Sequence, residues 1–144
     1  MIALLQRVSE ARVDVFGQTI ASIERGILAL IGVQAGDNQD TAEQFISRIL
    51  NYRLFADARD KMNLSLRDIN GGLLLVPQFT LAANTGKGRR PSFTSAAPPA
   101  LGESVYLSMV AYASDNYACV ESGRFGAHMA VYLINDGPVT FILD

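Results

Sequence analysis

Hydrophobic and polar residues alternate near the start of the chain with the two-residue period of a β-strand. The run GILALIGV, residues 26–33, is apolar throughout and predicts a strand that is buried on both faces. After Gly71-Gly72, the run LLLVPQFTLAA, residues 73–83, predicts the most apolar strand of the second half. By the same patterns we expect strands over residues 2–8, 11–15, 19–23, 52–55, 118–121, 127–134 and 139–143.

Apolar residues recur with the period of a helix in two other segments. The first predicted helix begins at Asp40, because Asp40 and Glu43 have the spacing of an N-terminal capping pair. The second begins at Pro98-Pro99, since proline is tolerated in a first helical turn. The residues expected on the buried sides of the two helices are Ala42, Phe45, Ile46, Ile49 and Leu50, and Leu101, Val105, Met109 and Tyr112.

These strands and the two helices, with short connections between them, predict an α/β fold of layered, mainly antiparallel β-sheets with two principal helices. The chain has 144 residues and neither a linker nor a repeat, so we expect a single domain over residues 1–144. Such a fold has strand edges to cover, and the last predicted strand is apolar. Dimerisation that hides a strand edge or a sheet face is therefore expected.

The charge and the cysteine content narrow the function classes. A net charge of −2 excludes a globally basic nucleic-acid-binding protein, although it is compatible with a local basic patch. No segment reaches the ~18 uninterrupted apolar residues of a membrane span, and the start lacks the features of a signal peptide. The single cysteine, Cys119, is typical of a reducing compartment. We therefore expect a soluble, cytoplasmic protein without membrane contact, in which Cys119 is a buried or half-buried filler.

Few residues are suited to metal binding or nucleophilic catalysis. His128 is the one histidine, and no Cys-x-x-Cys or His-x-x-x-His spacing occurs. We expect no metal and no cofactor, and we expect His128 to face solvent or a neighbouring side chain from a strand.

Three segments nevertheless have the composition of a functional site. In the first, Pro77 cannot donate to a strand ladder, which indicates an edge or a bulge there. Along a strand, Gln78 and Thr80 share one face, so these two residues could line a pocket together. The alternative is an ordinary edge strand with its polar side chains in water.

The second segment is the loop NTGKGRRPSF, residues 84–93. Its cations Lys87, Arg89 and Arg90, with an aromatic residue nearby, are suited to contacts with phosphates and bases. The glycine and lysine order of a phosphate-binding P-loop is absent. The alternative is a solvated loop without a ligand.

The third segment is Asn135-Asp136-Gly137-Pro138. Asp-Gly usually marks a hairpin turn, but the proline that follows cannot donate to a returning strand. A cis Gly-Pro bond would aim two successive carbonyl oxygens in one direction, and about 5–6% of bonds before proline are cis in folded proteins. A trans turn is the alternative.

Taken together, these segments resemble the D-aminoacyl-tRNA deacylase family, which includes the D-Tyr-tRNA deacylases. The resemblance extends from MIALLQRVSEARV through NYRLFAD, GGLLLVPQFTLAANTGKGRRPSF and SGRFGAHMAVYLINDGPVTF. It implies hydrolysis of the ester that joins a D-amino acid, or wrongly charged glycine, to the 3′-terminal adenosine of tRNA. This reaction is chiral proofreading in translation.

The resemblance also implies roles for particular residues. It implies a homodimer in which a cis Gly137-Pro138 reaches into the partner's site, offers carbonyl oxygens to the α-amino group and excludes L-amino acids. It implies that Phe125 and Met129 hold the terminal adenine. Backbone N–H groups of Phe79 and Thr80 are plausible oxyanion donors, and the Thr80 hydroxyl or the tRNA 2′-hydroxyl could assist hydrolysis.

Two positions depart from the commoner family pattern, which has serine where this chain has Pro77 and aspartate where it has Asn84. A role for the serine hydroxyl therefore does not carry over. Two other functions compete with the deacylase: a noncatalytic RNA-binding module that uses Lys87, Arg89 and Arg90, and a β-rich dimer with a structural role alone.

Overall fold

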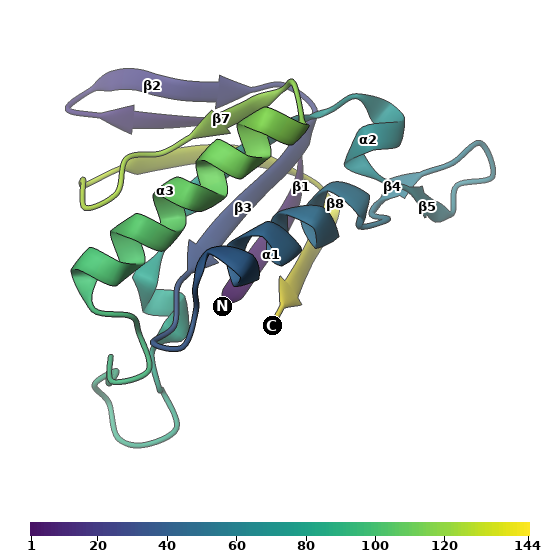
Figure 1. Cartoon of the computed structure of the whole chain (residues 1–144). Coiled ribbons are helices and arrows are strands. Elements are labelled where there is room, and N and C mark those ends of the chain that lie inside the picture. The colour runs from purple at the N-terminus through teal and green to yellow at the C-terminus, as the bar shows by residue number, and fades with distance from the viewer.

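The computed structural model describes residues 1–144 and contains a six-stranded sheet (Figure 1). Its longest strands are β1 (Ile2–Val15) and β8 (Ala130–Leu143), which pair antiparallel along their whole length. The other edge of β1 pairs first with β3 (Gly26–Gly32) and then with β2 (Gln18–Ile23), both antiparallel. Beyond β3, β6 (Gly72–Pro77) and β7 (Val120–Ser122) follow in parallel.

The two parallel pairs exist because helices cross between the strands. Helix α1 (Gln39–Asn51) lies between β3 and β6 in the chain, and α3 (Pro99–Asn116) lies between β6 and β7. Both helices cover the same face of the sheet (Figure 1). The predicted α/β fold, mainly antiparallel with two principal helices, is confirmed. None of the helices is both long and apolar enough to cross a membrane.

Two strands of the structure are longer than predicted. The strands predicted over residues 2–8 and 11–15 form one continuous strand, β1, and those predicted over 127–134 and 139–143 form β8. The pairing of β1 with β8 absorbs the interruptions as shifts of register near Val8. A bulge keeps a strand in its ladder while it bends the strand. The breaks that the local sequence predicts within β1 and β8 are therefore bends within continuous strands.

The start of α1 differs from the prediction. Asn38, which has an extended backbone, accepts a hydrogen bond from the Thr41 N–H at 3.0 Å and caps the helix. Asp40 and Glu43 do not form the capping pair, and Glu43 instead accepts from the Gln39 side chain at 2.9 Å. The predicted buried stripe of α1 is buried.

The strand predicted over residues 52–55 forms only at its last residue, where β4 (Phe55–Ala56) begins. Three other short elements were not predicted, namely β5 (Met62–Leu64), the helical turn α2 (Leu66–Ile69) and the 3₁₀-helix η1 (Phe79–Ala82). The strand predicted over residues 73–83 therefore ends at Pro77 and turns into η1. Cys119 is exposed between α3 and β7, so the expectation that it is buried or half-buried is wrong.

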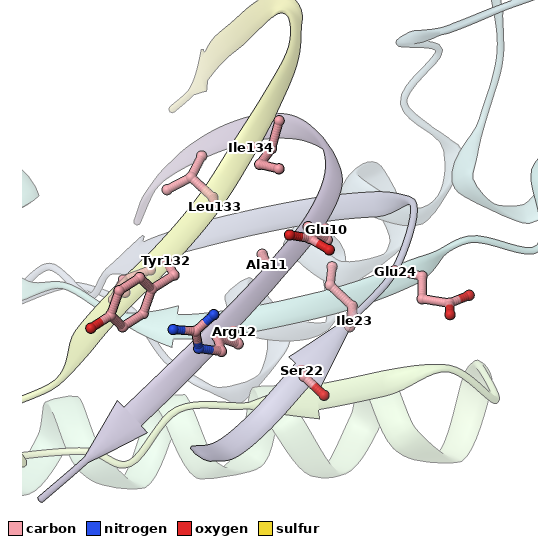
Figure 2. A pocket seen from close by; sticks show the side chains of 10 residues that line it. Glu10, Ala11, Arg12, Ser22, Ile23, Glu24, Tyr132, Leu133 and Ile134 are labelled. Atoms are coloured by element: carbon pink, nitrogen blue, oxygen red, sulfur yellow. The ribbon is translucent and has the colours of Figure 1, made fainter. Parts of the chain in front are cut away.

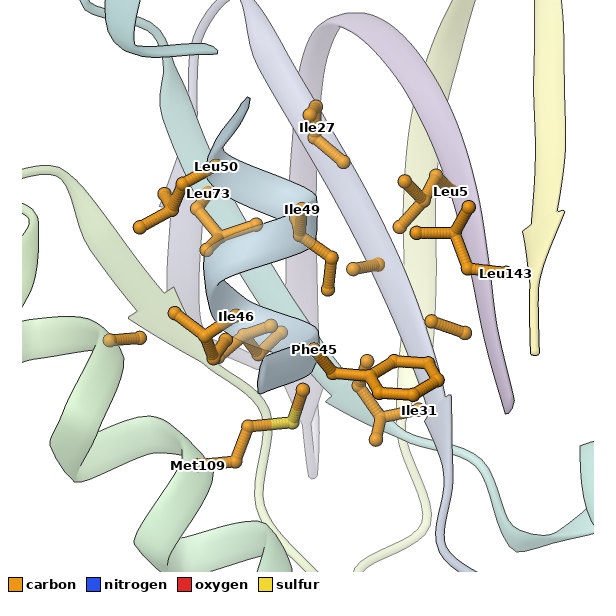
Figure 3. Close-up of a cluster of buried hydrophobic side chains, with 14 of the residues drawn as sticks. Leu5, Ile27, Ile31, Phe45, Ile46, Ile49, Leu50, Leu73, Met109 and Leu143 are labelled. Carbon is orange, nitrogen blue, oxygen red and sulfur yellow. The ribbon is translucent and has the colours of Figure 1, made fainter. Parts of the chain in front are cut away.

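Both faces of the central strands are buried, as the run 26–33 predicted. Ile27, Ala29 and Ile31 face α1 and α3, and Figure 3 shows this layer of the core around Phe45, Ile46, Ile49 and Met109. On the opposite face, Leu28 packs in a second apolar cluster because the sheet curves. The members of that cluster are Val8, Ala11, Val13, Val15, Ala21, Ile23, Leu28, Leu74 and Val76.

Candidate functional site

The strand β6 and the 3₁₀-helix η1 meet at Gln78. The Gln78 N–H donates to the Ile31 carbonyl at 2.7 Å, which adds one more bond to the ladder between β3 and β6. The chain then leaves the sheet, because Leu81 and Ala83 donate to Gln78 and Thr80 in the 3₁₀ pattern. Parallel strands commonly form ligand sites at their carboxyl ends, and this junction lies at that end of β3 and β6.

A mainly apolar pocket of about 250 Å³ opens at this junction. Gln78, Phe79 and Phe125 line it together, although Phe125 is far away in the sequence. The remaining lining residues are Ile31, Val33, Pro77, Ala97, Pro99, Gly102, Tyr106 and Gly126. Of the three segments singled out from the sequence, only the first lines this pocket, and Phe125 joins it from a distant part of the chain. A flat apolar group of a ligand could be enclosed there.

The hydroxyl of Tyr106 holds the walls of the pocket together. It donates to the Leu75 carbonyl at 2.9 Å and lies 3.3 Å from the Gly123 carbonyl, which joins α3 to β6 and to the segment before Phe125. Burial raises the pKa of Tyr106, so this hydroxyl keeps its proton at neutral pH. Sequence reasoning missed Tyr106. The signal in the sequence was the Tyr106 hydroxyl, the one side-chain polar group on the buried face of α3.

The first N–H groups of η1 are available to a ligand. The first hydrogen bond of the 3₁₀-helix is donated by Leu81, so the N–H groups of Phe79 and Thr80 have no partner within the helix. The Gln78 side-chain amide donates to the Thr80 hydroxyl oxygen. The spacing predicted that Gln78 and Thr80 could line a pocket together from one face of a strand. Instead they contact each other across a 3₁₀ turn, and only Gln78 lines the pocket. Thr80 is exposed and lies outside the pocket lining.

The basic loop lies beside η1. The backbones of Asn84 and Ser92 exchange two hydrogen bonds of 2.8 and 3.0 Å, which close the loop at its base. Lys87, Arg89 and Arg90 are exposed at the end of this loop, and none of them forms an ion pair. Directly after the base, the ring of Phe93 lies 5.1 Å from the ring of Phe79.

The structure separates Phe125 from Met129. Phe125 packs against Tyr106, with 6.1 Å between ring centroids, and lines the pocket. Met129 is absent from the lining and packs instead against the apolar cluster on the opposite face of the sheet. Its sulfur lies against Gly123, where an added Cβ would be 2.9 Å away.

The segment Asn135–Pro138 is a bulge within β8 and not a hairpin. Thr140 pairs with Gln6 and Asn135 pairs with Val8, so four residues of β8 stand opposite one residue of β1. The Asn135 side chain closes the bulge by accepting from the Val139 N–H at 2.7 Å. The bond between Gly137 and Pro138 is cis, and Gly137 has a φ of 147°.

Arg7 holds the bulge from the neighbouring strand. Its Nε donates to the Asp136 carbonyl at 2.8 Å, and a second nitrogen donates to the Leu54 carbonyl at 2.9 Å. Sequence reasoning missed Arg7, because a charged residue in an alternating strand is usually a solvated one. Gly137 and Pro138 are exposed and do not line the pocket of their own chain.

A groove of about 660 Å³ runs along β1, β2 and β8 (Figure 2). The Arg12 guanidinium covers the Tyr132 ring at 3.9 Å, and Glu10, Glu24 and Ile134 also line the groove. No residue predicted for the site from the sequence lies in this groove.

Comparison with known proteins identifies the fold and its family. A model of the D-Tyr-tRNA(Tyr) deacylase family matches residues 4–144. The chain is 57% identical over 144 residues to a D-aminoacyl-tRNA deacylase of Pseudomonas aeruginosa and 60% identical to one of Thioalkalivibrio sulfidiphilus. These alignments cover 100% of this chain and 99% and 97% of the two relatives.

Two solved structures share the fold of this chain. The c-Myc DNA unwinding element binding protein is 39% identical, with a TM-score of 0.95 over 100% of this chain and 98% of that chain. A probable eukaryotic D-amino acid tRNA deacylase, at 16% identity, shares the fold with a TM-score of 0.88 over 99% and 97% of the two chains. The resemblance inferred from the three segments is confirmed, and the chain belongs to the D-aminoacyl-tRNA deacylase family.

Proposed function

We propose that this protein hydrolyses the ester bond of D-aminoacyl-tRNA and releases the D-amino acid and free tRNA. Membership of the deacylase family supports a hydrolase that acts on aminoacyl-tRNA. The observation that carries the proposal is that the N–H groups of Phe79 and Thr80 have no helical partner at the start of η1, next to the apolar pocket that Phe79 lines.

The chemistry follows from this geometry. Attack of water on the ester carbonyl places negative charge on its oxygen, and preorganised backbone N–H groups stabilise that charge. The Thr80 oxygen accepts a hydrogen bond from Gln78, so its own hydrogen is directed elsewhere and is free to orient the attacking water. The 2′-hydroxyl of the tRNA ribose is the alternative for this role.

The pocket is the proposed site of the terminal adenine. Its lining is mainly apolar and includes the Phe125 ring, which suits the faces of a planar base. Met129 lies behind Gly123 in this chain, so its contribution is to support the segment that carries Phe125.

Gly137 and Pro138 are the proposed selector of chirality. Their carbonyl oxygens would receive the α-amino group, and an L-side chain would then collide with the backbone of the bulge, whereas a D-side chain points away. Because glycine has no side chain, the same filter admits glycyl-tRNA. Arg7 and Asn135 hold the bulge in place on both sides, as a steric filter requires.

This filter works on a partner's pocket, because Gly137 and Pro138 do not reach the pocket of their own chain. The proposed partner is a second copy. Strand β8 pairs only with β1, so its other edge is unpaired, and it exposes the large apolar residues Tyr132, Ile134 and Ile142. An unpaired edge with exposed apolar side chains favours association with another chain.

The proposed contacts with the tRNA backbone come from Lys87, Arg89 and Arg90. Three exposed cations without ion-pair partners are free to neutralise phosphates on one side of the pocket. Because the proposed substrate is tRNA, the proposed location of the protein is the cytoplasm, and a free cysteine agrees with that compartment.

The test is hydrolysis of D-Tyr-tRNA, L-Tyr-tRNA and glycyl-tRNA by the purified protein. We expect release of the D-amino acid and of glycine, with the L-ester left intact. Equal rates on both tyrosyl esters would contradict the chiral filter. Binding of tRNA without cleavage of any ester at high enzyme concentration would favour the noncatalytic RNA-binding module.

A further inference from the structure

Two large aromatic side chains remain exposed beside the pocket. Phe79 is 56% exposed and Phe93 is 42% exposed, although apolar residues of this size are usually buried. Their ring centroids are 5.1 Å apart at an angle of 53°. Phe79 also lines the pocket, whereas Phe93 lies outside it. The pair therefore continues the aromatic surface from the pocket to the outside.

The backbone fixes the position of Phe93. The bridge between Asn84 and Ser92 closes the basic loop directly before it. On the other side, the Phe93 carbonyl accepts from the Ala96 N–H at 3.1 Å, and the Ala97 N–H donates to the Val33 carbonyl at 3.0 Å. Phe93 is thus held in place while its ring stays open to solvent.

The surroundings of this pair are cationic. Lys87, Arg89 and Arg90 occupy the loop that ends at Phe93, and no carboxylate pairs with any of them. Aromatic rings next to unpaired cations are typical of sites for single-stranded nucleic acid, in which bases stack on the rings and phosphates meet the cations.

We propose that Phe93 stacks on the base of the nucleotide that precedes the terminal adenosine. This inference rests on the proposed function, since it takes the terminal adenine to occupy the pocket. The next base along the strand then leaves the pocket over the edge of Phe79 and meets the Phe93 ring, while its phosphates face the basic loop. Stacking makes no demand on the identity of this base, because every base has a π-face.

A structural role for Phe93 predicts a different result. If the ring served only to position Phe79, its loss would slow the hydrolysis of any ester that uses the pocket. A stacking role affects only substrates that possess the penultimate nucleotide. The two roles are therefore separated by comparing D-Tyr-tRNA with D-tyrosine esterified to the 3′-hydroxyl of adenosine alone.

The experiment measures kcat/KM of the wild type, Phe93→Ala, Phe93→Leu and Phe93→Tyr on both substrates. We expect Phe93→Ala to lower kcat/KM about 10-fold on the tRNA and less than about twofold on the adenosine ester. Phe93→Tyr should retain the wild-type rates, and Phe93→Leu, which is apolar without a π-face, should resemble alanine. Phe16→Ala is the matched control, because Phe16 is 98% exposed on another part of the surface.

An equal loss on both substrates, or no loss on the tRNA, would overturn the proposal. A binding measurement keeps the inference testable if the wild type cleaves neither ester, which would contradict the proposed function. A single-stranded trinucleotide RNA ending in adenosine should bind more tightly than one that is abasic at its penultimate position. Phe93→Ala should abolish this preference, and a preference that survives the substitution would refute stacking on Phe93.

Discussion

Single polar atoms do much to define the site of this protein. The Tyr106 hydroxyl links α3, β6 and the segment that carries Phe125. Arg7 in the same way joins β1 to the bulge of β8 and to Leu54. Each of these two side chains donates hydrogen bonds to backbone carbonyls that would otherwise bind water. Because these carbonyls belong to segments that are distant in the sequence, the bonds fix where those segments lie.

Substitution of Tyr106 by phenylalanine should therefore be costly. It removes the donor from the Leu75 and Gly123 carbonyls within a buried environment, and we expect the free energy of unfolding to fall by about 1–3 kcal/mol. Urea denaturation measures this change. Tyr112→Phe on the same helix is the control, because its half-buried hydroxyl has no hydrogen-bond partner in the structure. An equal cost for the two substitutions would refute the role of the Tyr106 hydroxyl.

Among the elements, η1 and α1 show how a few residues end or begin regular structure. Pro77 is the last residue of β6, and one further N–H, from Gln78, reaches β3 before the chain turns into η1. That change of structure frees the N–H groups of Phe79 and Thr80. A strand through residue 83 would have placed these groups in a ladder or at a sheet edge instead.

The first turn of α1 yields a prediction that separates two candidate caps. Asn38→Ala should lower the free energy of unfolding by about 1 kcal/mol, because the Thr41 N–H loses its acceptor. Asp40→Ala should cost less, since Asp40 acts only through its charge near the N-terminus of the helix. Thermal or urea denaturation of both variants checks this order. A larger cost for Asp40→Ala would mean that the capping pair inferred from the sequence is the real one.

At the scale of the whole molecule, the proposed site combines two regions that one chain does not bring together. The pocket lies at the ends of β3 and β6, whereas Gly137 and Pro138 protrude from β8. In the proposed dimer, each complete site combines the pocket of one copy with the bulge of the other.

Mixed dimers test this division directly. Gly137→Ala should disturb the bulge, because a Cβ there would lie 2.7 Å from the Val139 side chain and 2.8 Å from its nitrogen. Gly102→Leu should fill the pocket, because Gly102 lines it and a Cβ there would already lie 3.4 Å from the Phe125 ring. Each variant alone should be nearly inactive on D-Tyr-tRNA.

Co-expression of the two variants should restore activity to about one quarter of the wild-type rate, since half of the dimers are mixed and each contains one complete site. Co-expression of Gly137→Ala with Gly36→Ala is the control, because the added Cβ of Gly36→Ala meets nothing within 4 Å. This pair shows how much activity is restored by a second copy in which both the pocket and the bulge are intact. If the mixed pair were no more active than the separate variants, the bulge would act within its own chain.

Periodicity in the sequence was sufficient to predict those parts of the fold in which one or both faces of an element are buried. The buried stripe of α1 and the doubly buried run of β3 were predicted, because the side chain at each position reports on its own environment. The fold class and the family also followed from the sequence.

Only the tertiary structure decided how the predicted segments meet. Local rules read Asn135–Pro138 as a turn, yet β1 pairs on both sides of it and makes it a bulge. Phe125 reaches the pocket and Met129 does not, although four positions separate them, because the chain between them passes from one face of the sheet to the other. Such outcomes depend on partners that are distant in the chain, namely Arg7 for the bulge and Tyr106 for the pocket. The sequence by itself thus determined which faces are buried, whereas the structure determined which backbone groups lie free at the site, because hydrogen bonds between distant segments place them there.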